Sequence, residues 1–224
     1  MSSPQGSAAS SFTDLMASLL AVFVLLFVVA QNKRVGDRNE DRDLIIQQLR
    51  GELKQAGIDS AAVNRDPRDP NSVVVIFPDS VLFVRGDSAM MPRGDEIVRQ
   101  TTPGLARVLC SDTIRPRLDQ IVVEGHTDST APPGLTSQRG RRYNLRLSQL
   151  RSMDYVAKST ESLADNERSL GCYLDLVSAS GRGQEDPLPN MPKDAAAQRR
   201  VLLRIRLHTD VKDTLRLGSS PGGP

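Results

Sequence analysis

An aspartate and an arginine, Asp128 and Arg151, could together bind a ligand that carries both an ammonium and a carboxylate. Asp128 follows a β-branched run at residues 121–124, so we expect its carboxylate on a loop at the edge of a sheet. Arg151 comes later, where Asn144 and Ser148 are four positions apart, a spacing typical of one helix face. Aspartate pairs with an ammonium, and a planar guanidinium binds a carboxylate through two parallel hydrogen bonds. The end of a free amino acid would satisfy both groups; alternatively, Asp128 and Arg151 bridge each other.

A metal or acid–base cluster is the competing interpretation of the same segment. Glu124, His126 and Asp128 alternate along the chain, so on a strand they would point to one side. The only other histidine is His208, and the sequence contains neither a nucleophile motif nor a glycine-rich phosphate loop. We therefore predict no enzyme activity, no metal and no cofactor. His126 is interpreted as a structural residue whose ring nitrogens hold the loop.

Asp14 is the third candidate, because it lies inside the one membrane-length apolar run of the chain, residues 12–30. At about 1.5 Å per residue, a helix over this run spans roughly 28 Å, which is enough for a bilayer core. A carboxylate in lipid costs roughly 2.5–3.5 kcal/mol near the helix centre, so it tends to face protein or to carry protons. Alternatively, Asp14 lies at the membrane interface or helps to cap the helix start.

The residues on either side of this apolar run indicate whether it is cleaved and how it is oriented in the membrane. No Lys or Arg precedes it, and it is longer than a usual signal-peptide core, so we predict an uncleaved membrane anchor. Lys33, Arg34, Arg38 and Arg42 follow it. By the positive-inside rule, these basic residues favour a cytoplasmic location for the C-terminal part of the chain.

Composition excludes some functions and leaves one question open. The net charge of +2, without a basic patch interleaved with aromatic residues, argues against direct nucleic-acid binding. Cys110 and Cys172 are in no metal-ligand spacing. They could form one disulfide in an oxidising compartment, or remain two buried, unreactive thiols.

Length and composition indicate one membrane anchor and one soluble domain. We predict a short tail at residues 1–11, a transmembrane helix at 12–30, a charged linker at 31–70, a domain at 71–210 and a disordered tail at 211–224. In the linker, Leu44, Ile45, Leu49 and Leu53 recur at helical spacing. They predict a short amphipathic helix that either pairs with a copy of itself or lies alone on the surface.

The predicted domain alternates strands and helices. Strands are expected at residues 73–77, 121–124, 174–178 and 201–207, and helices at 94–110 and 144–159. Pro103 should interrupt or restart the first helix. In the last strand, Leu203 and Ile205 alternate with Arg204 and Arg206, which indicates one buried and one solvated face. The sum is an α/β sandwich in which helices cover one side of a small mixed sheet.

Four motifs in this order resemble the OmpA-like peptidoglycan-binding domain. They are EGHTDS at residues 124–129, N-x-x-L-S-x-x-R at 144–151, SGRGQEDP at 180–187 and QRRV at 198–201. The resemblance implies that Asp128 and Arg151 hold the diaminopimelate end of the peptidoglycan stem peptide. It also assigns four further residues to the site: Thr127, Asn144, Ser148 and Arg200. A long Arg/Gly-rich loop at 130–143, Gln198 and Arg182 depart from the family pattern, so binding is expected to be altered.

The anchor resembles the transmembrane helix of MotB-type stator subunits, on the run FTDLMASLL at residues 12–20. The short tail, this run and the positions of the two cysteines are most similar to the MotB-like ZorB subunits of Zorya anti-phage defence. The resemblance implies that Asp14 carries ions, with protons favoured over sodium. It also implies a homodimer inside a ring of MotA-like (ZorA-like) membrane subunits in the bacterial inner membrane. The N-terminus would be cytoplasmic and the domain periplasmic, against the charge rule. A flagellar stator or a passive envelope tether are the alternatives.

Overall fold

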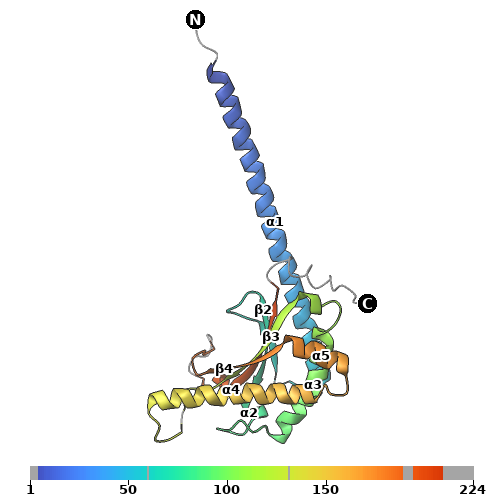
Figure 1. Ribbon diagram of the computed structural model, residues 1–224, viewed down its shortest axis with the longest axis vertical. Coiled ribbons are helices and arrows are strands. Elements are labelled where there is room, and N and C mark those ends of the chain that lie inside the picture. The colour runs from blue at the N-terminus through green and yellow to red at the C-terminus, as the bar shows by residue number, and fades with distance from the viewer. Residues whose placement is uncertain (1–4, 60, 131, 189–193, 209–224) are drawn as a thin grey trace, which may run out of the picture. The chain divides into compact units, whose positions relative to one another are not determined.

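The structure is a computed structural model and describes residues 5–59, 61–130, 132–188 and 194–208 (Figure 1). The chain divides into two compact units, Met1–Asp41 and Arg42–Pro224. The predicted disordered tail at 211–224 lies outside the described residues. Residues 5–11 of the predicted N-terminal tail are helical, because helix α1 covers Gln5–Gln55.

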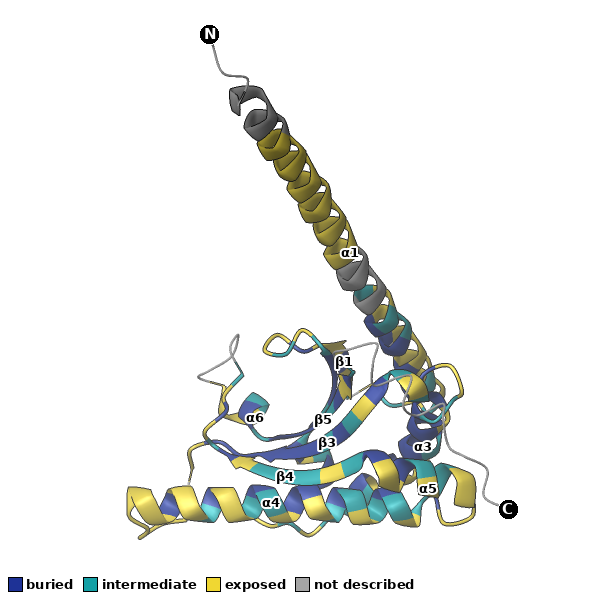
Figure 2. Ribbon diagram, turned by 45° about the horizontal axis from the view of Figure 1, so that its top comes forward, coloured by how far each residue is buried: buried dark blue, intermediate teal, exposed yellow. Residues whose placement is uncertain are grey.

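The first unit contains the apolar stretch of α1. Phe12–Asn32 is long and apolar enough to cross a membrane, and it is the one such helix in the described part of the chain. Every side chain in this stretch is exposed, as the yellow segment of Figure 2 shows. Asp14 is its only charged residue. The apolar surface is therefore available to lipid or to partner subunits, as the sequence predicts for a membrane anchor.

The end of α1 belongs to the second unit, which differs from the predicted linker. Ile45, Leu49 and Leu53 are buried in the same hydrophobic core as the sheet. The stretch after α1 is tied to it as well, because Asp43 and Arg65 form an ion pair of 2.6 Å. The apolar stripe thus packs within its own chain, and residues 42–59 and 61–70 fold with the domain that was predicted to begin at residue 71. Pairing with a second copy stays a prediction.

The sheet is mixed and has the strand order β1-β2-β5-β3-β4. Its strands are β1 (Ala62–Arg65), β2 (Ser72–Pro78), β3 (Leu118–His126), β4 (Val177–Gly183) and β5 (Arg200–Leu207). β3 and β4 are parallel and all other neighbours antiparallel. In β5, Leu203 and Ile205 are buried and Arg206 is exposed, which is the predicted alternation. The short edge strand β1 was not predicted from the sequence.

The helices of the domain are α2 (Asp79–Leu82), α3 (Pro92–Leu109), α4 (Ser137–Glu161), α5 (Glu167–Leu176) and α6 (Ala195–Gln198), with a 3-10 turn at Arg115–Arg117. α3 continues through Pro103, contrary to the prediction. Buried residues on both sides of the proline, Val98 and Leu105, hold the two halves against the core. Residues 174–176 end α5 rather than starting a strand, because Tyr173 and Leu176 are buried at helical spacing.

Helix α4 begins at Ser137, so half of the predicted loop at 130–143 is helical. The Thr136 hydroxyl caps it by accepting a hydrogen bond from the Arg139 N–H. α4 lies along β4 (Figure 2), and two glycines allow this close approach. A Cβ on Gly125 would collide with the Ser148 backbone, and one on Gly181 would lie 2.6 Å from the Gln149 nitrogen. Gly125 therefore brings α4 against the sheet at the end of β3.

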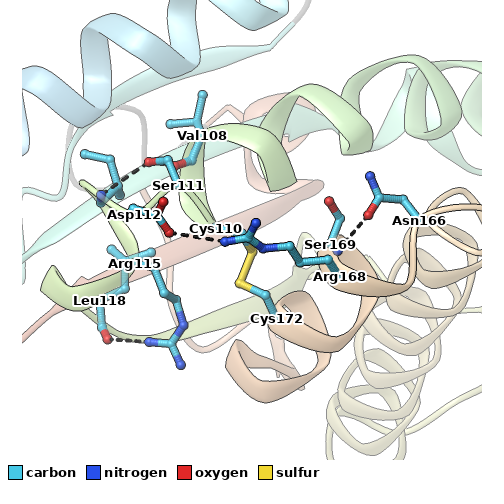
Figure 3. The surroundings of a disulfide bond; sticks show 11 residues. Val108, Cys110, Ser111, Asp112, Arg115, Leu118, Asn166, Arg168, Ser169 and Cys172 are labelled. Carbon is cyan, nitrogen blue, oxygen red and sulfur yellow. Dashed lines mark hydrogen bonds and ion pairs between the residues drawn. A yellow bond between two sulfur atoms is a disulfide. The ribbon is translucent and has the colours of Figure 1, made fainter. Parts of the chain in front are cut away.

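Cys110 and Cys172 form a disulfide (Figure 3). Cys110 directly follows α3, and Cys172 lies in α5. The bond closes a separation of 62 positions, which restricts the unfolded chain and links two helices of the domain. Of the two states that the sequence leaves open for these cysteines, the structure contains the disulfide.

Candidate functional site

A cavity of about 340 Å³ lies in the domain where the end of β3, helix α4 and the loop after α2 meet. It is lined by Arg85, Gly86, Thr127, Asp128, Thr130, Pro132, Tyr143, Asn144, Leu147, Arg151 and Arg199. Four of the predicted site residues, Thr127, Asp128, Asn144 and Arg151, are among them. The motif spacing in the sequence thus corresponds to one place in the fold.

Asp128 is ionised and held in place by its own chain. Its Oδ1 accepts a hydrogen bond of 2.8 Å from the Thr130 N–H, and its Oδ2 pairs with the Arg199 guanidinium. Burial opposes ionisation of Asp128, but the hydrogen bonds from Arg199 and Thr130 outweigh it and hold its pKa below the usual value. The Arg199 side chain is 31% exposed and lines the cavity, so a ligand in the cavity can reach it.

Arg151 is almost fully buried, with 2% of its surface exposed. It forms an ion pair of 2.8 Å with Asp79, and its Nε donates a hydrogen bond of 2.9 Å to the Asp87 carbonyl. Its guanidinium also lies over the Phe83 ring, 5.4 Å from the ring centre. Burial lowers the pKa of Arg151 and raises that of Asp79, although their mutual attraction opposes both shifts. Arg151 therefore fixes the loop after α2 as well as lining the cavity.

Asp128 and Arg151 do not bridge each other, which was the alternative reading of the sequence. Each has its own ionic partner, Arg199 for Asp128 and Asp79 for Arg151. Neither partner was predicted from the sequence. The available signal for Arg199 was its place beside Arg200 in the terminal motif, whereas nothing in the sequence marks Asp79.

Asn144 and Thr127 support the cavity wall. The Asn144 amide donates hydrogen bonds of 3.1 Å to the Asp128 carbonyl and 2.9 Å to the Gln184 side chain. The Thr127 N–H donates to the Gly183 carbonyl at 2.9 Å. Within the described residues the Thr127 hydroxyl has no hydrogen-bond partner, although it is buried. A buried hydroxyl at a cavity wall can accept or donate one bond to a ligand.

Ser148 and Arg200 lie outside the cavity lining, unlike the sequence expectation. The Ser148 hydroxyl donates to the Leu145 carbonyl and accepts from the Gly183 N–H, both at 2.8 Å, so it ties α4 to β4. Arg200 is 3% exposed and donates to the Asp186 carbonyl at 3.0 Å. Burial lowers its pKa to about 10. The side chains of neighbouring residues in an extended chain point to opposite sides. Arg199 therefore lines the cavity, and the Arg200 side chain lies on the side away from it.

A second polar cluster, which we call the β3 cluster, consists of Glu124, His126 and Asp186 and could in principle hold a metal. Arginines already bind its carboxylates. Both Glu124 oxygens accept from Arg204, at 3.2 and 3.1 Å, and Asp186 pairs with Arg68. A cation would have to displace these guanidinium groups from the same oxygens. We therefore interpret the β3 cluster as ion pairs that stabilise the fold rather than as a metal site.

His126 lies in this cluster, 1% exposed, with its Nε2 3.4 Å from a Glu124 oxygen. Burial lowers its pKa to about 4, so the ring is neutral at pH 7. Its nitrogens have no hydrogen-bond partner in the described residues, so they do not hold the loop as predicted. The bonds from Asn144 to the Asp128 carbonyl and from Thr127 to Gly183 do this instead.

Solved structures share this fold. A MotB-like protein from Desulfovibrio vulgaris is similar over 79% of this chain and 98% of its own, with 20% sequence identity and a TM-score of 0.54. The predicted fold class is thereby confirmed. The C-terminal unit has a MotB-like fold.

Two further structures are similar at lower scores. The periplasmic domain of Helicobacter pylori MotB covers 73% of this chain and 91% of its own, with 13% identity and a TM-score of 0.48. The cell wall anchor of the T6SS from Pseudomonas aeruginosa covers 73% and 97%, with 20% identity and a TM-score of 0.46. No protein-family model matches the chain, and no curated protein sequence does.

Proposed function

We propose that this chain is a peptidoglycan-anchored, ion-conducting stator subunit of a MotAB-like motor in the bacterial inner membrane. One observation carries the proposal: an exposed apolar helix with a single carboxylate, Asp14, is joined to a domain of MotB-like fold with a charged cavity. In the cavity, Asp128 would bind the ammonium of the diaminopimelate end. The carboxylate of the same diaminopimelate end would bind the arginines Arg151 and Arg199.

The proposed topology has a cytoplasmic N-terminus and a periplasmic domain. The Cys110–Cys172 disulfide supports it, because disulfides persist in oxidising compartments and are rare in the cytosol. The charge pattern after the span argues the other way. We give the disulfide more weight, since it concerns the compartment of the folded domain itself.

Two copies of the chain would lie inside a ring of MotA-like (ZorA-like) subunits, which would cover the exposed apolar helix. Asp14 would take up and release protons at the boundary between helix and ring, since a carboxylate in an apolar layer needs a partner or a proton. Each charge that moves down the membrane potential supplies about 2.3 kcal/mol per 100 mV. That energy would turn the ring around a dimer fixed to peptidoglycan.

We further propose that the motor acts in anti-phage defence, on the resemblance of the anchor run and the cysteine positions to ZorB subunits. The test is phage plating on cells that carry this gene with its native neighbours, comparing wild type with Asp14→Asn. Protection should be lost in Asp14→Asn at unchanged membrane levels. Ser18→Ala is the matched control, because the Ser18 hydroxyl bonds only to the Leu15 carbonyl of its own helix in the described structure.

The other outcomes favour the alternatives. Equal protection by wild type and Asp14→Asn would contradict ion conduction and leave a passive peptidoglycan tether. If neither protects but wild type restores swimming to a strain that lacks its flagellar stator, the chain is a flagellar MotB-type subunit.

A further inference from the structure

The cavity lining contains more positively charged than negatively charged side chains. Arg85, Arg151 and Arg199 are positive, and Asp128 is the one acidic residue of the lining. Arg151 is neutralised from behind by Asp79, and Arg199 by Asp128. Arg85 is exposed and forms no ion pair with any acidic residue in the described part of the chain. One positive charge in the cavity is therefore available to a ligand.

The loop that carries Arg85 is fixed, so this charge has a defined place. Gly86 turns the chain with a φ of 75°, a conformation that favours glycine. Its carbonyl accepts a hydrogen bond of 2.7 Å from the Tyr143 hydroxyl, and the Asp87 carbonyl accepts one of 2.9 Å from Arg151. The Asp87 carboxylate is used inside the loop, where it accepts from the Ser88 N–H at 2.7 Å. It does not line the cavity.

Helix α4 adds positive charge on the same flank. Arg139 and Arg146 lie four residues before and three after Tyr143, so they share its helix face. Both are exposed, and neither forms an ion pair with another described residue. The first turn of α4 contains no acidic residue, although a helix start favours negative charge. Two further arginines therefore lie on the α4 face that carries Tyr143, although neither lines the cavity.

From this excess charge we infer that the cavity binds a ligand with a second carboxylate in addition to its zwitterionic end, and that Arg85 is the residue that selects it. The inference rests on the proposed function and sharpens its ligand. A zwitterionic amino-acid end has no net charge and would leave Arg85 uncompensated. The stem-peptide residue before the diamino acid is a glutamate whose α-carboxylate is either free or amidated. Arg85 would distinguish the two forms by a charge-assisted hydrogen bond.

The test uses two synthetic tripeptides in which the carboxyl group beside the acylated amine of diaminopimelate is blocked as a methylamide, so that this carboxylate cannot pair with Arg85. One is L-Ala-γ-D-Glu-meso-diaminopimelate with the glutamate α-carboxylate free, and the other is the same peptide with that carboxylate amidated. Their affinities for the full-length chain in detergent are measured by calorimetry. We expect wild type to bind the free-carboxylate form about 10-fold more tightly. Arg85→Gln should bind both forms equally, with the affinity that wild type has for the amidated one.

Arg142→Gln is the matched control, because it removes the same charge from an exposed residue of α4 that does not line the cavity. It should keep the preference. Equal binding of both peptides by wild type would overturn the inference and leave the proposed function intact. If Arg142→Gln lost the preference for the free-carboxylate peptide as fully as Arg85→Gln, a direct contact between Arg85 and the glutamate carboxylate would be contradicted. Failure of wild type to bind either peptide would overturn the proposed peptidoglycan function along with the inference.

Discussion

Glu124 and Asp128 lie four residues apart near the end of β3 and are similarly buried, but their partner arginines differ in exposure. Glu124 is 6% exposed and bonds through both oxygens to Arg204, whose side chain is 14% exposed. Asp128 is 8% exposed and pairs with Arg199, whose side chain is 31% exposed and lines a cavity. The difference lies in the partner arginine. Arg204 is mostly buried, whereas Arg199 is more exposed and lines the cavity, where a ligand could contact it. Burial of a carboxylate therefore does not by itself show whether a ligand could reach the ion pair that it forms.

Glu124→Gln should give the largest effect on the structural side of this comparison. Removing one partner of a buried ion pair typically costs 3–5 kcal/mol, and we expect about 3 kcal/mol because Asp66 still pairs with Arg204. Thermal unfolding of the full-length chain in detergent should show a Tm lowered by about 10 °C. Affinity for the stem tripeptide should stay within about twofold.

Glu185→Gln is the control for that experiment, since it removes an ion pair with Arg141 at the surface, where both side chains are more than half exposed. Such pairs contribute less than about 1 kcal/mol. Equal Tm values for Glu124→Gln and wild type would mean that the β3 cluster does not hold the sheet together.

Asp128→Asn tests the other side of the comparison. Loss of one charge-assisted hydrogen bond to the ligand ammonium costs about 2 kcal/mol, which corresponds to a roughly 30-fold weaker affinity for the stem tripeptide by calorimetry. Its Tm should fall less than that of Glu124→Gln, because Arg199 remains in contact with solvent. A lower Tm with unchanged affinity would reverse the roles that we assign to the two carboxylates.

A further prediction, of similar size, concerns pH and His126. In the unfolded chain a histidine binds its proton near pH 6.5, whereas in the folded domain His126 does so only near pH 4. The stability from a neutral His126 is therefore complete above pH 6.5 and is lost as the pH falls toward 4. Between pH 7 and pH 5 wild type should lose about 2 kcal/mol more than His126→Gln, measured by unfolding at both values. Parallel losses would contradict a neutral, buried ring.

The sequence predicted the parts of the molecule that repeat a simple period. The β-branched runs of β2, β3 and β5 and the long apolar stretch of α1 were recognised, because alternation and length are visible in the sequence alone. Four cavity residues were found through motif spacing, including Asp128 and Arg151. Pro103 was misjudged because tertiary packing holds α3 together across it. Asp79 and Arg85 were missed, since their roles depend on where the loop after α2 comes to lie.

The residues before the predicted domain show the same limit. The spacing of Ile45, Leu49 and Leu53 indicated a short amphipathic helix, whereas these residues lie at the end of the long helix α1, and the spacing does not show which surface they cover. Apolar residues at helical spacing indicate that one face of the helix must be buried. They do not indicate whether it packs against a second copy or against another part of the same chain. Likewise, two cysteines far apart in sequence cannot reveal that α3 and α5 bring them together.

We propose that the Asp128 cavity holds the chain on peptidoglycan, and co-sedimentation with purified sacculi is a direct test of this proposal. The full-length chain in detergent should sediment with sacculi and be released by an excess of the stem tripeptide. Asp128→Asn should remain in the supernatant, whereas Glu185→Gln should sediment like wild type. Sedimentation of Asp128→Asn at the wild-type level, with no release by the tripeptide, would contradict the account.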